Sequence, residues 1–551
     1  MAALCRAEAL AALARGVDVL VVGGGITGAG VALDAASRGY RVGLVERQDF
    51  ASGTSSRSTR LIHGGIRYLP QGHLHLVSQA LQERKRLLRL APHLVHPLGF
   101  VVPLYAGTRR PLGIQLPRLL QPFAALGVRL GLLAYDVLAR DPRLRHRVLK
   151  GEALAQLAPD LRREGLRRAF LYFDARTDDV RLTHAVLATA RAHGAVTLNY
   201  AEVAAFLHRQ GRVAGAGVVD RLSGRSLEVP ARAVVNATGI WAEQVAAWGG
   251  PPPFHLRHSK GVHLVLRPGA VRASAALVIP ETDDGRLAFV VPWRERFVLG
   301  TTDTPYHGEL DAPGVEKAEV DYLLEHANRY LTAGLRPQDV VAAYAGIRPL
   351  VSRAQGPTAS LPRDHVVVVS GSGLITVTGG KLATYRRMAQ DAVDAVVRQE
   401  GRRRPCRTHR LPLAGAAGLE AADAALPPLA PASRTHLLET YGSLARDVVA
   451  LAREDERLLQ PLIPGLPHLA AEVVYGCRAE QLVSLADCLF LRTRLALLDP
   501  NAADAVAPQL AILMAKELGW DEAEVARQLA QYRARRRLEA PPPAGNPHFP
   551  A

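Results

Sequence analysis

The chain has 551 residues, enough for about two to four domains, and its 48% hydrophobic and 22% charged residues are ordinary proportions for a globular protein. Its formal net charge of +17 makes nucleic acid, anionic lipid and anionic substrates the partners to consider, although a bias towards Arg, Ala and Leu would account for much of that charge. No signal-peptide pattern and no apolar run of roughly 18 residues is present, and the four cysteines are scattered. A membrane span, a disulfide framework and a zinc site are therefore not indicated, and a reducing, cytoplasmic compartment is expected.

The first elements predict a parallel α/β unit. Val17–Val22 is a short apolar run typical of a buried strand, and Ile26–Arg38 has small and apolar residues at helical spacing. Arg41–Glu46 follows as a second strand, and residues 75–92 form a charged helix. This βαβ order indicates an α/β domain.

The middle of the chain is richer in predicted strands. A helix at Thr183–His193 leads into a strand at Val196–Asn199. Later apolar and alternating runs predict the antiparallel strands Val203–Val219, Ser226–Val235, Val262–Leu266, Ala288–Val291 and Phe297–Gly300. A very apolar strand at Val366–Ser370 and a helix at Lys381–Arg398 close this part of the chain.

The glycines after the first strand form a phosphate-binding pattern. Gly23, Gly25 and Gly28 make a G-x-G-x-x-G directly between the predicted strand and helix. The first glycine permits the tight turn, the second lets the backbone approach a pyrophosphate, and the third packs helix against strand. The helix N-terminus adds amide donors and a favourable dipole. Glu46 ends the next strand, where an acidic residue bonds ribose hydroxyls, so the unit predicts a bound dinucleotide.

Two further glycine turns favour FAD over NAD. Asn236–Gly239 ends a predicted strand far downstream and could close over the first site. Thr378–Lys381 precedes a helix whose N-terminus would stabilise negative charge on a reduced flavin. Three separate turns fit a long FAD better than they fit NAD. Because no His or Cys stands in an evident flavin-linking context, we expect FAD to be held non-covalently.

Longer motifs carry a family resemblance. The run Ser55–Leu69 (SSRSTRLIHGGIRYL), with the glycine motif before it, resembles the FAD-dependent, quinone-linked glycerol-3-phosphate dehydrogenases. Further matches stand in the family's order: VPWRERFVLGTTDT (Val291–Thr304), YAGIRPL (Tyr344–Leu350), PRDHVV (Pro362–Val367), TGGKLATYR (Thr378–Arg386) and YGCRAEQLVSLADCLFLRTRLALL (Tyr475–Leu498). The resemblance extends from about residue 16 to residue 535, nearly the whole chain.

The resemblance and the element pattern together predict the domain organisation. We expect an α/β fold in which a Rossmann-like FAD-binding domain is interleaved with an antiparallel-sheet substrate lobe, followed by an all-helical C-terminal domain. The oxidoreductase domain is placed at 16–400, with FAD-binding parts at 16–90, 180–250 and 355–400 and substrate-lobe parts at 91–179 and 251–354. A basic break at Gly401–Pro405 and a linker-like Ala417–Ala432 precede the helical cap at 405–538, and a disordered tail is expected at 540–551.

The family resemblance also implies a reaction. It implies that sn-glycerol 3-phosphate is oxidised at C2 to dihydroxyacetone phosphate, with a hydride passing to FAD and electrons leaving to a quinone, as in enzymes of the EC 1.1.5.3 type. By the match, the substrate pocket is lined by Arg67, Tyr68, Arg348 and Arg363. Arginine suits a phosphate dianion because its guanidinium donates two parallel hydrogen bonds. His63 is the candidate base for the C2 hydroxyl proton, whereas Arg348 could instead polarise the developing alkoxide.

Residues assigned to the cofactor come from all three glycine turns and from loops beside them. Lys381 is expected next to the flavin. The assigned set is Gly23, Gly25, Gly28, Glu46, Thr54, Ser55, Val203, Ala237, Thr238, Gly239, Gly379, Gly380 and Lys381. Asp303 is interpreted as a turn residue rather than a catalytic acid, and no metal site is expected from His255, His258 and His263 at a strand entry.

Two rival functions and several partners stay open. An oxidase of the same family would pass electrons to oxygen and release peroxide. A non-catalytic nucleic-acid-binding protein would need aromatic side chains among its basic patches, and aromatic residues are only 5% of the chain. We also consider a homodimer and a peripheral position on the inner face of an anionic membrane. Either the apolar and Arg-rich stretch Pro111–Arg147 or the cap around Arg492–Arg494 could supply the contact surface.

Overall fold

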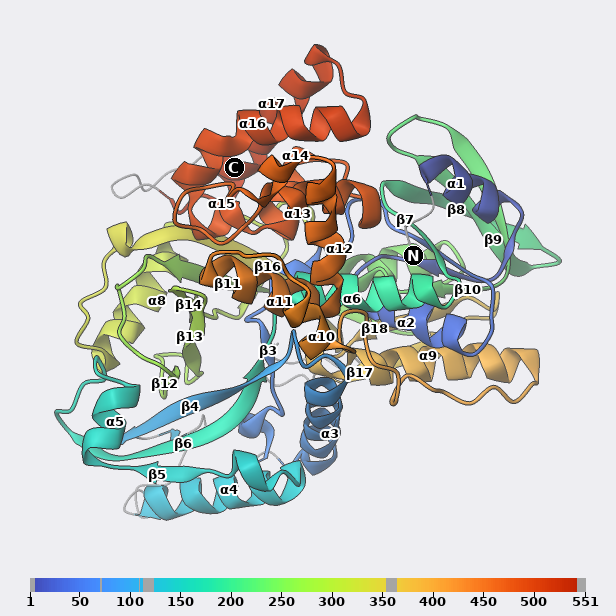
Figure 1. Cartoon of the computed structure of the whole chain (residues 1–551). Helices are drawn as coiled ribbons and strands as arrows, with labels where there is room; N and C mark the ends of the chain where they lie inside the picture. The colour runs from blue at the N-terminus through green and yellow to red at the C-terminus, as the bar shows by residue number, and fades with distance from the viewer. Residues whose placement is uncertain (1–4, 70–71, 109, 112–122, 353–363, 543–551) are drawn as a thin grey trace.

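The computed structural model describes residues 5–69, 72–108, 110–111, 123–352 and 364–542 (Figure 1). Arg363, predicted to bind substrate, and most of the predicted tail at 540–551 lie outside the described residues. Two sheets lie beside each other, and helices from the C-terminal part of the chain cover their junction (Figure 1). The predicted fold class, α/β with mixed sheets and a helical C-terminal part, is confirmed.

The first sheet contains the predicted βαβ unit. Its central strand β1 is parallel to both neighbours, since Val21 pairs with Leu44 on one side and with Val235 on the other. The strand order is β17 (His365–Val369), β18 (Ile375–Gly379), β10 (Ser226–Asn236), β1 (Val17–Val22), β2 (Val42–Val45) and β7 (Val196–Leu198). The antiparallel strands β9 (Arg212–Asp220) and β8 (Ala201–Arg209) extend from β10.

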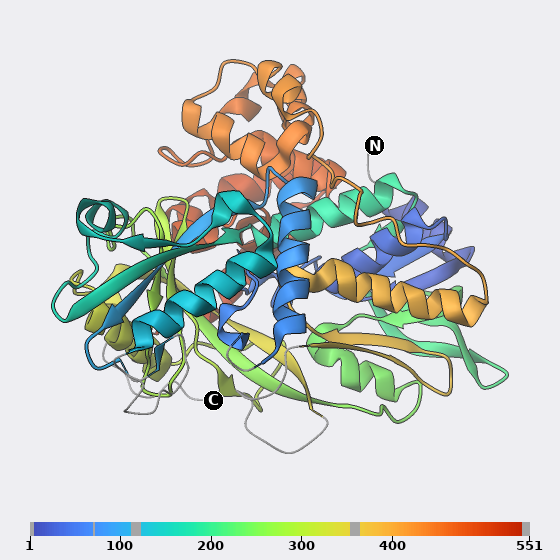
Figure 2. The ribbon, with the colours of Figure 1, turned by 90° about the horizontal axis from the view of Figure 1, so that it is seen from below.

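The alternating side chains of β1 serve two separate cores. Val19 and Val21 are fully buried beneath three helices, α2 (Ile26–Ser37), α6 (Asp179–Ala192) and α9 (Tyr385–Glu400). Leu20 points the other way and is buried with α1 (Arg6–Ala14) and the β8–β9 hairpin. Figure 2 shows α9 lying along the sheet beside α2. A strand buried on both faces is expected to be a continuous apolar run, as VDVLVV nearly is.

The second sheet is mainly antiparallel. Its order is β15 (Thr304–Pro305), β11 (His255–Leu266), β14 (Arg296–Gly300), β13 (Ala288–Trp293), β12 (Ala276–Ile279), β4 (His96–Tyr105), β6 (Leu166–Arg176) and β3 (Leu61–Ile62). The long strand β16 (Val340–Ser352) pairs with β11, and β5 (Arg147–Leu149) pairs with β6. Because β3 belongs to this sheet, the segment 16–90 contributes to both sheets.

Helices cover both faces of the second sheet. One face packs against α5 (Gly151–Leu157) and α8 (Lys317–Tyr330). The other packs against α3 (Leu74–Leu90) and α4 (Ala124–Ala139), and α4 lies on the side of the molecule opposite the C-terminal helices (Figures 1 and 2). Within the described ranges, no helix combines the length and the apolar character that crossing a bilayer requires.

The C-terminal part is helical, as predicted. Its helices are α10 (Leu419–Ala424), α11 (Pro431–Tyr441), α12 (Ala445–Ala450), α13 (Ala470–Ala479), α14 (Leu485–Asp487), α15 (Leu495–Leu498), α16 (Pro500–Leu518) and α17 (Glu522–Leu538). α15 packs against β16 of the second sheet, and their apolar residues share a core. The linker-like stretch Ala417–Ala432 contains α10 and the start of α11, so it is more ordered than its Ala and Pro content suggested.

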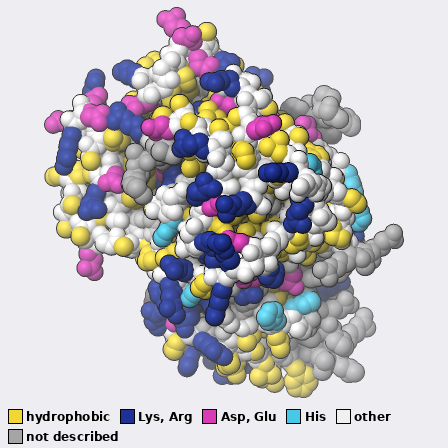
Figure 3. Space-filling model, turned by 90° about the vertical axis from the view of Figure 1, so that its right-hand side faces the viewer, with side chains coloured by type: hydrophobic (Ala, Val, Ile, Leu, Met, Phe, Trp, Pro, Cys, Tyr) yellow, Lys and Arg dark blue, Asp and Glu magenta, His cyan; other side chains and the backbone are white. Residues whose placement is uncertain are grey.

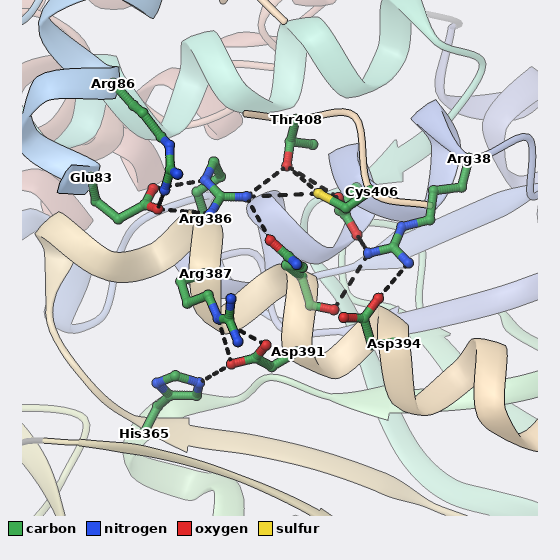
Figure 4. A network of polar contacts seen from close by, with 12 residues as sticks. Arg38, Glu83, Arg86, His365, Arg386, Arg387, Asp391, Asp394, Cys406 and Thr408 are labelled. Atoms are coloured by element: carbon green, nitrogen blue, oxygen red, sulfur yellow. Dashed lines mark hydrogen bonds and ion pairs between the residues drawn. The ribbon is translucent and has the colours of Figure 1, made fainter. Parts of the chain in front are cut away.

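A buried polar network fastens the segment that leads into the C-terminal helices (Figure 4). Arg38, directly after α2, donates to the Arg404 carbonyl at 2.9 Å, and the Arg404 guanidinium donates back to the Arg38 carbonyl at 3.1 Å. The Cys406 thiol donates to Asp34 at 2.9 Å. Arg386 on α9 pairs in two-pronged fashion with Glu83 on α3, at 2.7 Å for both bonds. The segment after the basic break near residue 401 is therefore held in place by hydrogen bonds and is not a loose linker.

Candidate active site

A cavity of about 470 Å³ lies where the two sheets meet. Parallel strands of an α/β sheet usually bind ligands beyond their carboxyl ends, and β1, β10 and β18 all end at this cavity. Residues of the second sheet close its other side. The predicted site residues that line it are Gly23, Gly25, Glu46, Thr54, Ser55, His63, Arg67, Val203, Ala237, Thr238, Gly239, Arg348, Gly379, Gly380 and Lys381.

The first glycine turn has the close approaches that its motif predicts. Gly23 has a φ of +107°, which L side chains rarely adopt. A Cβ placed on Gly28 would lie 1.9 Å from the Gly23 carbonyl oxygen, so this glycine supports the turn from behind rather than lining the cavity. The backbone N–H of Ile26 at the start of α2 donates to the Ser55 hydroxyl at 2.9 Å. The helix N-terminus and the Thr54–Ser55 loop therefore face the cavity together.

Glu46 lies at the end of β2, where the motif placed it. Its carboxylate accepts hydrogen bonds from the backbone N–H groups of Gly24 at 2.7 Å and Gln48 at 2.9 Å. Burial raises the pKa of this carboxyl above its usual value, and the two amide donors act in the opposite direction. Each oxygen retains acceptor capacity, so the carboxylate can also take hydrogen bonds from ribose hydroxyls.

The second and third glycine turns are joined to each other. Asn236 accepts from the Thr238 hydroxyl at 2.7 Å and fixes the turn that ends β10. The Thr378 hydroxyl donates to the Gly239 carbonyl at 3.1 Å, which ties the end of β18 to that turn. Gly379 and Gly380 follow with positive φ values of 79° and 75°. The predicted helix over Lys381–Arg398 begins later than expected, with a 3-10 turn at Leu382–Thr384 before α9 starts at Tyr385.

A cationic cluster stands between the third turn and the HGGIRYL segment. The Lys381 ammonium lies 4.2 Å from the centre of the Tyr68 ring. Arg67 donates to the Tyr68 hydroxyl at 2.8 Å. Tyr68 is only 5% exposed and supports these two cations rather than forming part of the cavity wall. Arg67 and Tyr68, assigned to the substrate, therefore lie beside Lys381, which was assigned to the flavin.

Arg348 is held rigidly on β16. Its guanidinium donates to the Thr301 hydroxyl at 2.9 Å and the Thr302 carbonyl at 3.2 Å, and it pairs with Asp303 at 3.2 Å. A Cβ on Gly261 would lie 2.2 Å from the Arg348 Nη2 atom, so a larger residue there would displace the guanidinium from this position. Asp303 thus orients an arginine of the cavity, in agreement with its interpretation as a structural residue.

Buried charges position the loop that carries His63. The backbone N–H of Gly64 donates to Asp174 at 3.1 Å, and Asp174 also accepts from Tyr135 at 2.7 Å and from Arg84 at 2.6 Å. Burial raises the pKa of the Asp174 carboxyl, while the Arg84 charge and these hydrogen bonds lower it. This support fixes the segment after His63, whose side chain lines the cavity.

Sequence reasoning missed two chemically important residues of the cavity, Arg286 and His263. Arg286 pairs with Asp303 at 3.6 Å, which adds a second guanidinium beside Arg348. The His263 ring stacks on Tyr344 at 5.0 Å and its Nε2 atom lies 2.8 Å from the Thr59 hydroxyl. Burial, together with the Arg348 and Arg60 charges, lowers the pKa of His263 well below 6.5, so the ring is neutral at neutral pH.

The three histidines considered as metal ligands do not converge. His255 contacts Glu243 at 2.8 Å and His258 contacts the Ile240 carbonyl at 2.9 Å, while His263 faces Thr59. Among the residues whose structure is described, no group of three potential metal ligands was found.

The cap also contacts the cofactor loop, which corrects one prediction. Arg492 and Arg494 were considered as a membrane surface, but they are only 4% and 2% exposed. Arg492 pairs with Asp49 at 2.6 Å, while Arg494 pairs with Asp179 and donates to the Ser56 carbonyl at 3.3 Å. These two arginines hold the loop beside Ser55 to the cap. The prediction that they form a membrane surface is wrong because their partners are buried carboxylates that lie far away in the sequence.

The donor set of the cavity fits FAD. Amide groups at the start of α2 suit a pyrophosphate, the Glu46 carboxylate suits a ribose, and Lys381 adds a cation directly after the third glycine turn. An FAD dependent oxidoreductase family model matches residues 18–386, and the model for the C-terminal domain of alpha-glycerophosphate oxidase matches residues 406–525.

Individual relatives agree with these matches. Glycerol-3-phosphate dehydrogenase 2 of Mycobacterium tuberculosis is 39% identical over 530 residues, which cover 94% of this chain and 88% of the relative. The mitochondrial glycerol-3-phosphate dehydrogenase of Arabidopsis thaliana is 38% identical over 555 residues, covering 93% of this chain and 85% of the relative.

Solved structures support the same assignment. The glycerol-3-phosphate dehydrogenase from Bacillus halodurans, solved with FAD, superimposes with a TM-score of 0.80 at 30% identity and 99% coverage of both chains. L-alpha-glycerophosphate oxidase from Mycoplasma pneumoniae shares the fold alone, with a TM-score of 0.54 at 17% identity over 69% of this chain and 94% of the other. The resemblance found in the sequence is confirmed: the chain belongs to the FAD-dependent oxidoreductases and, within them, to the glycerol-3-phosphate dehydrogenase family.

Proposed function

We propose that this enzyme oxidises sn-glycerol 3-phosphate at C2 to dihydroxyacetone phosphate and passes the electrons to a quinone. One observation carries the proposal. A single cavity combines three glycine turns suited to FAD with several guanidinium groups, among them those of Arg67, Arg286 and Arg348. The first set binds a flavin dinucleotide and the second neutralises a phosphate ester beside it.

The cofactor roles follow from the geometry of the turns. FAD, when bound, supplies the acceptor for the hydride that leaves C2. The amides at the start of α2, near Gly25, hold the pyrophosphate, and Glu46 takes the ribose hydroxyls. Lys381, at the third turn, stabilises negative charge that develops on the reduced ring system. We expect FAD to be held without a covalent bond.

The substrate roles divide between charge and proton transfer. Arg67 and Arg348 bind the phosphate, with Arg363 of the PRDH motif as a further predicted contact. His63 lines the same cavity and is the proposed acceptor of the C2 hydroxyl proton. Arg348 is the alternative, acting by stabilising the alkoxide as the proton leaves, since an arginine side chain stays protonated in proteins.

A membrane position fits the outer surface of α4. Beside Phe123, which is 61% exposed, the outer side chains Leu126, Leu130, Leu133 and Val137 are each more than half exposed. The segment that follows, residues 140–150, exposes several arginines, and many basic side chains also lie on the face shown in Figure 3. An apolar stripe bordered by arginine suits an anionic bilayer, where a quinone is dissolved. We therefore propose that the enzyme lies on the inner face of the cell membrane. We also propose that its two domains span residues 16–400 and 405–538, and that it forms a homodimer.

Flavin bleaching tests the substrate. The purified yellow holoenzyme, kept anaerobic, is mixed with glycerol 3-phosphate and with a panel of free and phosphorylated polyols. Loss of the flavin absorbance with glycerol 3-phosphate, and much slower loss with glycerol, supports the proposal because only the phosphate ester engages the arginines. Equal bleaching by glycerol, or none by either compound, contradicts it.

The electron acceptor is tested separately. We expect rapid turnover with a short-chain quinone and little peroxide when oxygen is the only acceptor. Fast peroxide release without added quinone would identify an oxidase instead.

A further inference from the structure

A second cavity, of about 390 Å³, lies between the second sheet and the C-terminal helices. Its wall includes residues that the proposed reaction does not use. Four of them are arginines, Arg60, Arg176, Arg181 and Arg294. Two of these are already neutralised by the protein: Arg181 makes a two-pronged pair with Glu480 at 2.7 and 3.0 Å, and Arg176 lies 3.9 Å from Glu439.

Of the other two arginines, Arg60 keeps unused donors. Arg60 is only 2% exposed, and its Nε and Nη2 atoms have no hydrogen-bond partner among the described residues. Its guanidinium lies 3.6 Å above the Trp293 ring and spends one donor on the Tyr344 hydroxyl at 3.1 Å. A buried guanidinium that is stacked in place yet leaves donors unsatisfied is unusual, since such groups normally find partners.

Arg294 approaches the same cavity from the turn after β13. One of its nitrogens contacts the His468 Nε2 atom at 2.8 Å. Burial lowers the pKa of His468 well below 6.5, so the ring is neutral and gives no charge to the pair. Neither Arg294 nor Arg60 forms a direct ion pair in the described part of the chain, but the buried Asp178 carboxylate is close enough for its charge to act on both guanidinium groups. Both residues also have left-handed backbones, with φ values of 55° and 58°, a conformation that often marks functional positions.

The acidic groups on the wall leave room for a ligand with both an anionic and a hydroxyl part. Asp178 accepts the Arg181 backbone N–H at 2.9 Å, and Glu295 is exposed at the rim. Glu439 is taken up by Arg176. A phosphate at the unused Arg60 donors, with a hydroxyl of the same ligand directed at Asp178, would complete the hydrogen bonding of Arg60.

The second cavity shares one wall residue with the active site. Thr59 lines both cavities, and its hydroxyl contacts His263, which lines the first. Tyr344, which accepts from Arg60, stacks on the same histidine at 5.0 Å. An anion bound to Arg60 would therefore be linked, through Tyr344, to the His263 ring that lines the first cavity.

We propose that this second cavity is a binding site for a phosphate-bearing small molecule, held by Arg60 and Arg294 and separate from the substrate cavity. The proposal does not depend on which polyol the enzyme oxidises. It goes beyond the proposed function because no step of that reaction requires the site.

The test measures inorganic phosphate binding to the holoenzyme by titration calorimetry. Two variants address the site from opposite directions: Arg294→Gln removes one guanidinium, and Ala432→Glu adds a carboxylate from the exposed start of α11, which lines the cavity. Arg453→Gln, at an exposed position outside the cavity, is the matched control for charge. Hydroxylated phosphate monoesters are compared with phosphate alone to separate an ester ligand from the free ion.

We expect two classes of phosphate site in the wild type and in Arg453→Gln. In Arg294→Gln and Ala432→Glu, phosphate binding to one of the two classes of site should weaken at least tenfold, while binding to the substrate site should stay unchanged. Any inhibition by phosphate that remains in these variants then comes from the substrate cavity. A monoester that binds more tightly than phosphate identifies the ester as the ligand. Wild-type binding in both variants, or a single class of site in the wild-type enzyme, would overturn the proposal.

Discussion

At the scale of single residues, the main feature of the substrate end is an arginine that needs no rearrangement. Arg348 is fixed by Thr301, Thr302 and Asp303, so its charge already faces the cavity. Preorganised charge stabilises a transition state more than charge that must first be ordered. This separates Arg348 from the many exposed arginines of the chain.

Replacing Arg348 by methionine should lower kcat/KM for glycerol 3-phosphate by about 100- to 1,000-fold, the scale of losing one preorganised donor. The flavin absorbance per protein should stay unchanged because the cofactor turns are elsewhere. Steady-state kinetics with a quinone acceptor measures the effect. Arg267→Met, at a half-exposed arginine outside the cavity, is the control and should change kcat/KM less than twofold. A comparable loss in the control would show that general charge, not position, matters.

Buried neutral histidines should make the protein sensitive to acid. His184 on α6 is 2% exposed, neither ring nitrogen has a partner in the described structure, and burial lowers its pKa well below 6.5. Below pH 6.5 the unfolded state binds a proton that the folded state does not, so stability is full above 6.5 and falls with decreasing pH. Each pH unit in that window removes up to about 1.4 kcal/mol per histidine.

The variant His184→Met tests this origin of acid sensitivity. Its free energy of unfolding should fall less between pH 7 and pH 5 than that of the wild type, by about 1–2 kcal/mol. Denaturant unfolding at several pH values provides the comparison, with the exposed His208→Met as control. Equal slopes for the wild type and His184→Met would rule out this residue as a source.

The glycine turns could be predicted from the sequence because their chemistry is local. Arg286 and His263 could not, since their neighbours come from distant strands. In the antiparallel register of β11 with β16, His263 stands opposite Tyr344, and this pairing brings the histidine to the cavity. Arg348 on β16 meets Thr301, which follows β14, because both strands pair with β11, a relation that no motif spacing contains.

At the scale of elements, α2 depends on one close approach. Gly28→Ala should displace the helix start, because its Cβ would lie 1.9 Å from a carbonyl oxygen. We expect flavin content to drop at least tenfold after gel filtration and unfolding to occur at a lower temperature. Gly127→Ala on α4 is the matched control, as its Cβ would meet nothing within 4 Å and a helical Gly→Ala change stabilises by roughly 0.5–1 kcal/mol. Normal flavin content in Gly28→Ala would contradict the role of this glycine.

Most elements of the first sheet could be predicted because their apolar periodicity is strong, whereas the second sheet was predicted less well: its long strands β4, β6 and β16 were not predicted. Strand β11 begins at His255, well before the predicted start at Val262. Its first half contains Arg257, His258 and Lys260, so the local pattern is that of a loop. Pairing with β16, from His255 opposite Ser352 onwards, keeps this polar segment extended. Pairing with a strand that is distant in the sequence therefore outweighs the low strand propensity of this polar segment.

At the scale of the whole molecule, the apolar face of α4 lies opposite the cap. Leu130→Glu combined with Leu133→Glu should reduce binding to vesicles containing phosphatidylglycerol by at least about tenfold, because two exposed apolar side chains are lost and two negative charges are added. Activity with a water-soluble quinone should be unchanged. Leu222→Glu, in an exposed turn of the first sheet, is the control in a sedimentation assay. Unchanged vesicle binding in the double variant would remove α4 as the contact surface.

The buried pairs between cap and cofactor loop make cofactor loading and cap attachment one linked equilibrium. Arg492 with Asp49 and Arg494 with the Ser56 carbonyl join the two parts of the chain through the loop that faces the cavity. Any ligand that orders this loop must also favour the docked cap, by roughly 2.7 kcal/mol when its free concentration is a hundred times its Kd. The supply of flavin would then control how fast the protein is degraded. Protein without flavin would expose the connecting segment, residues 401–418, to proteases, whereas flavin-bound protein would keep this segment protected.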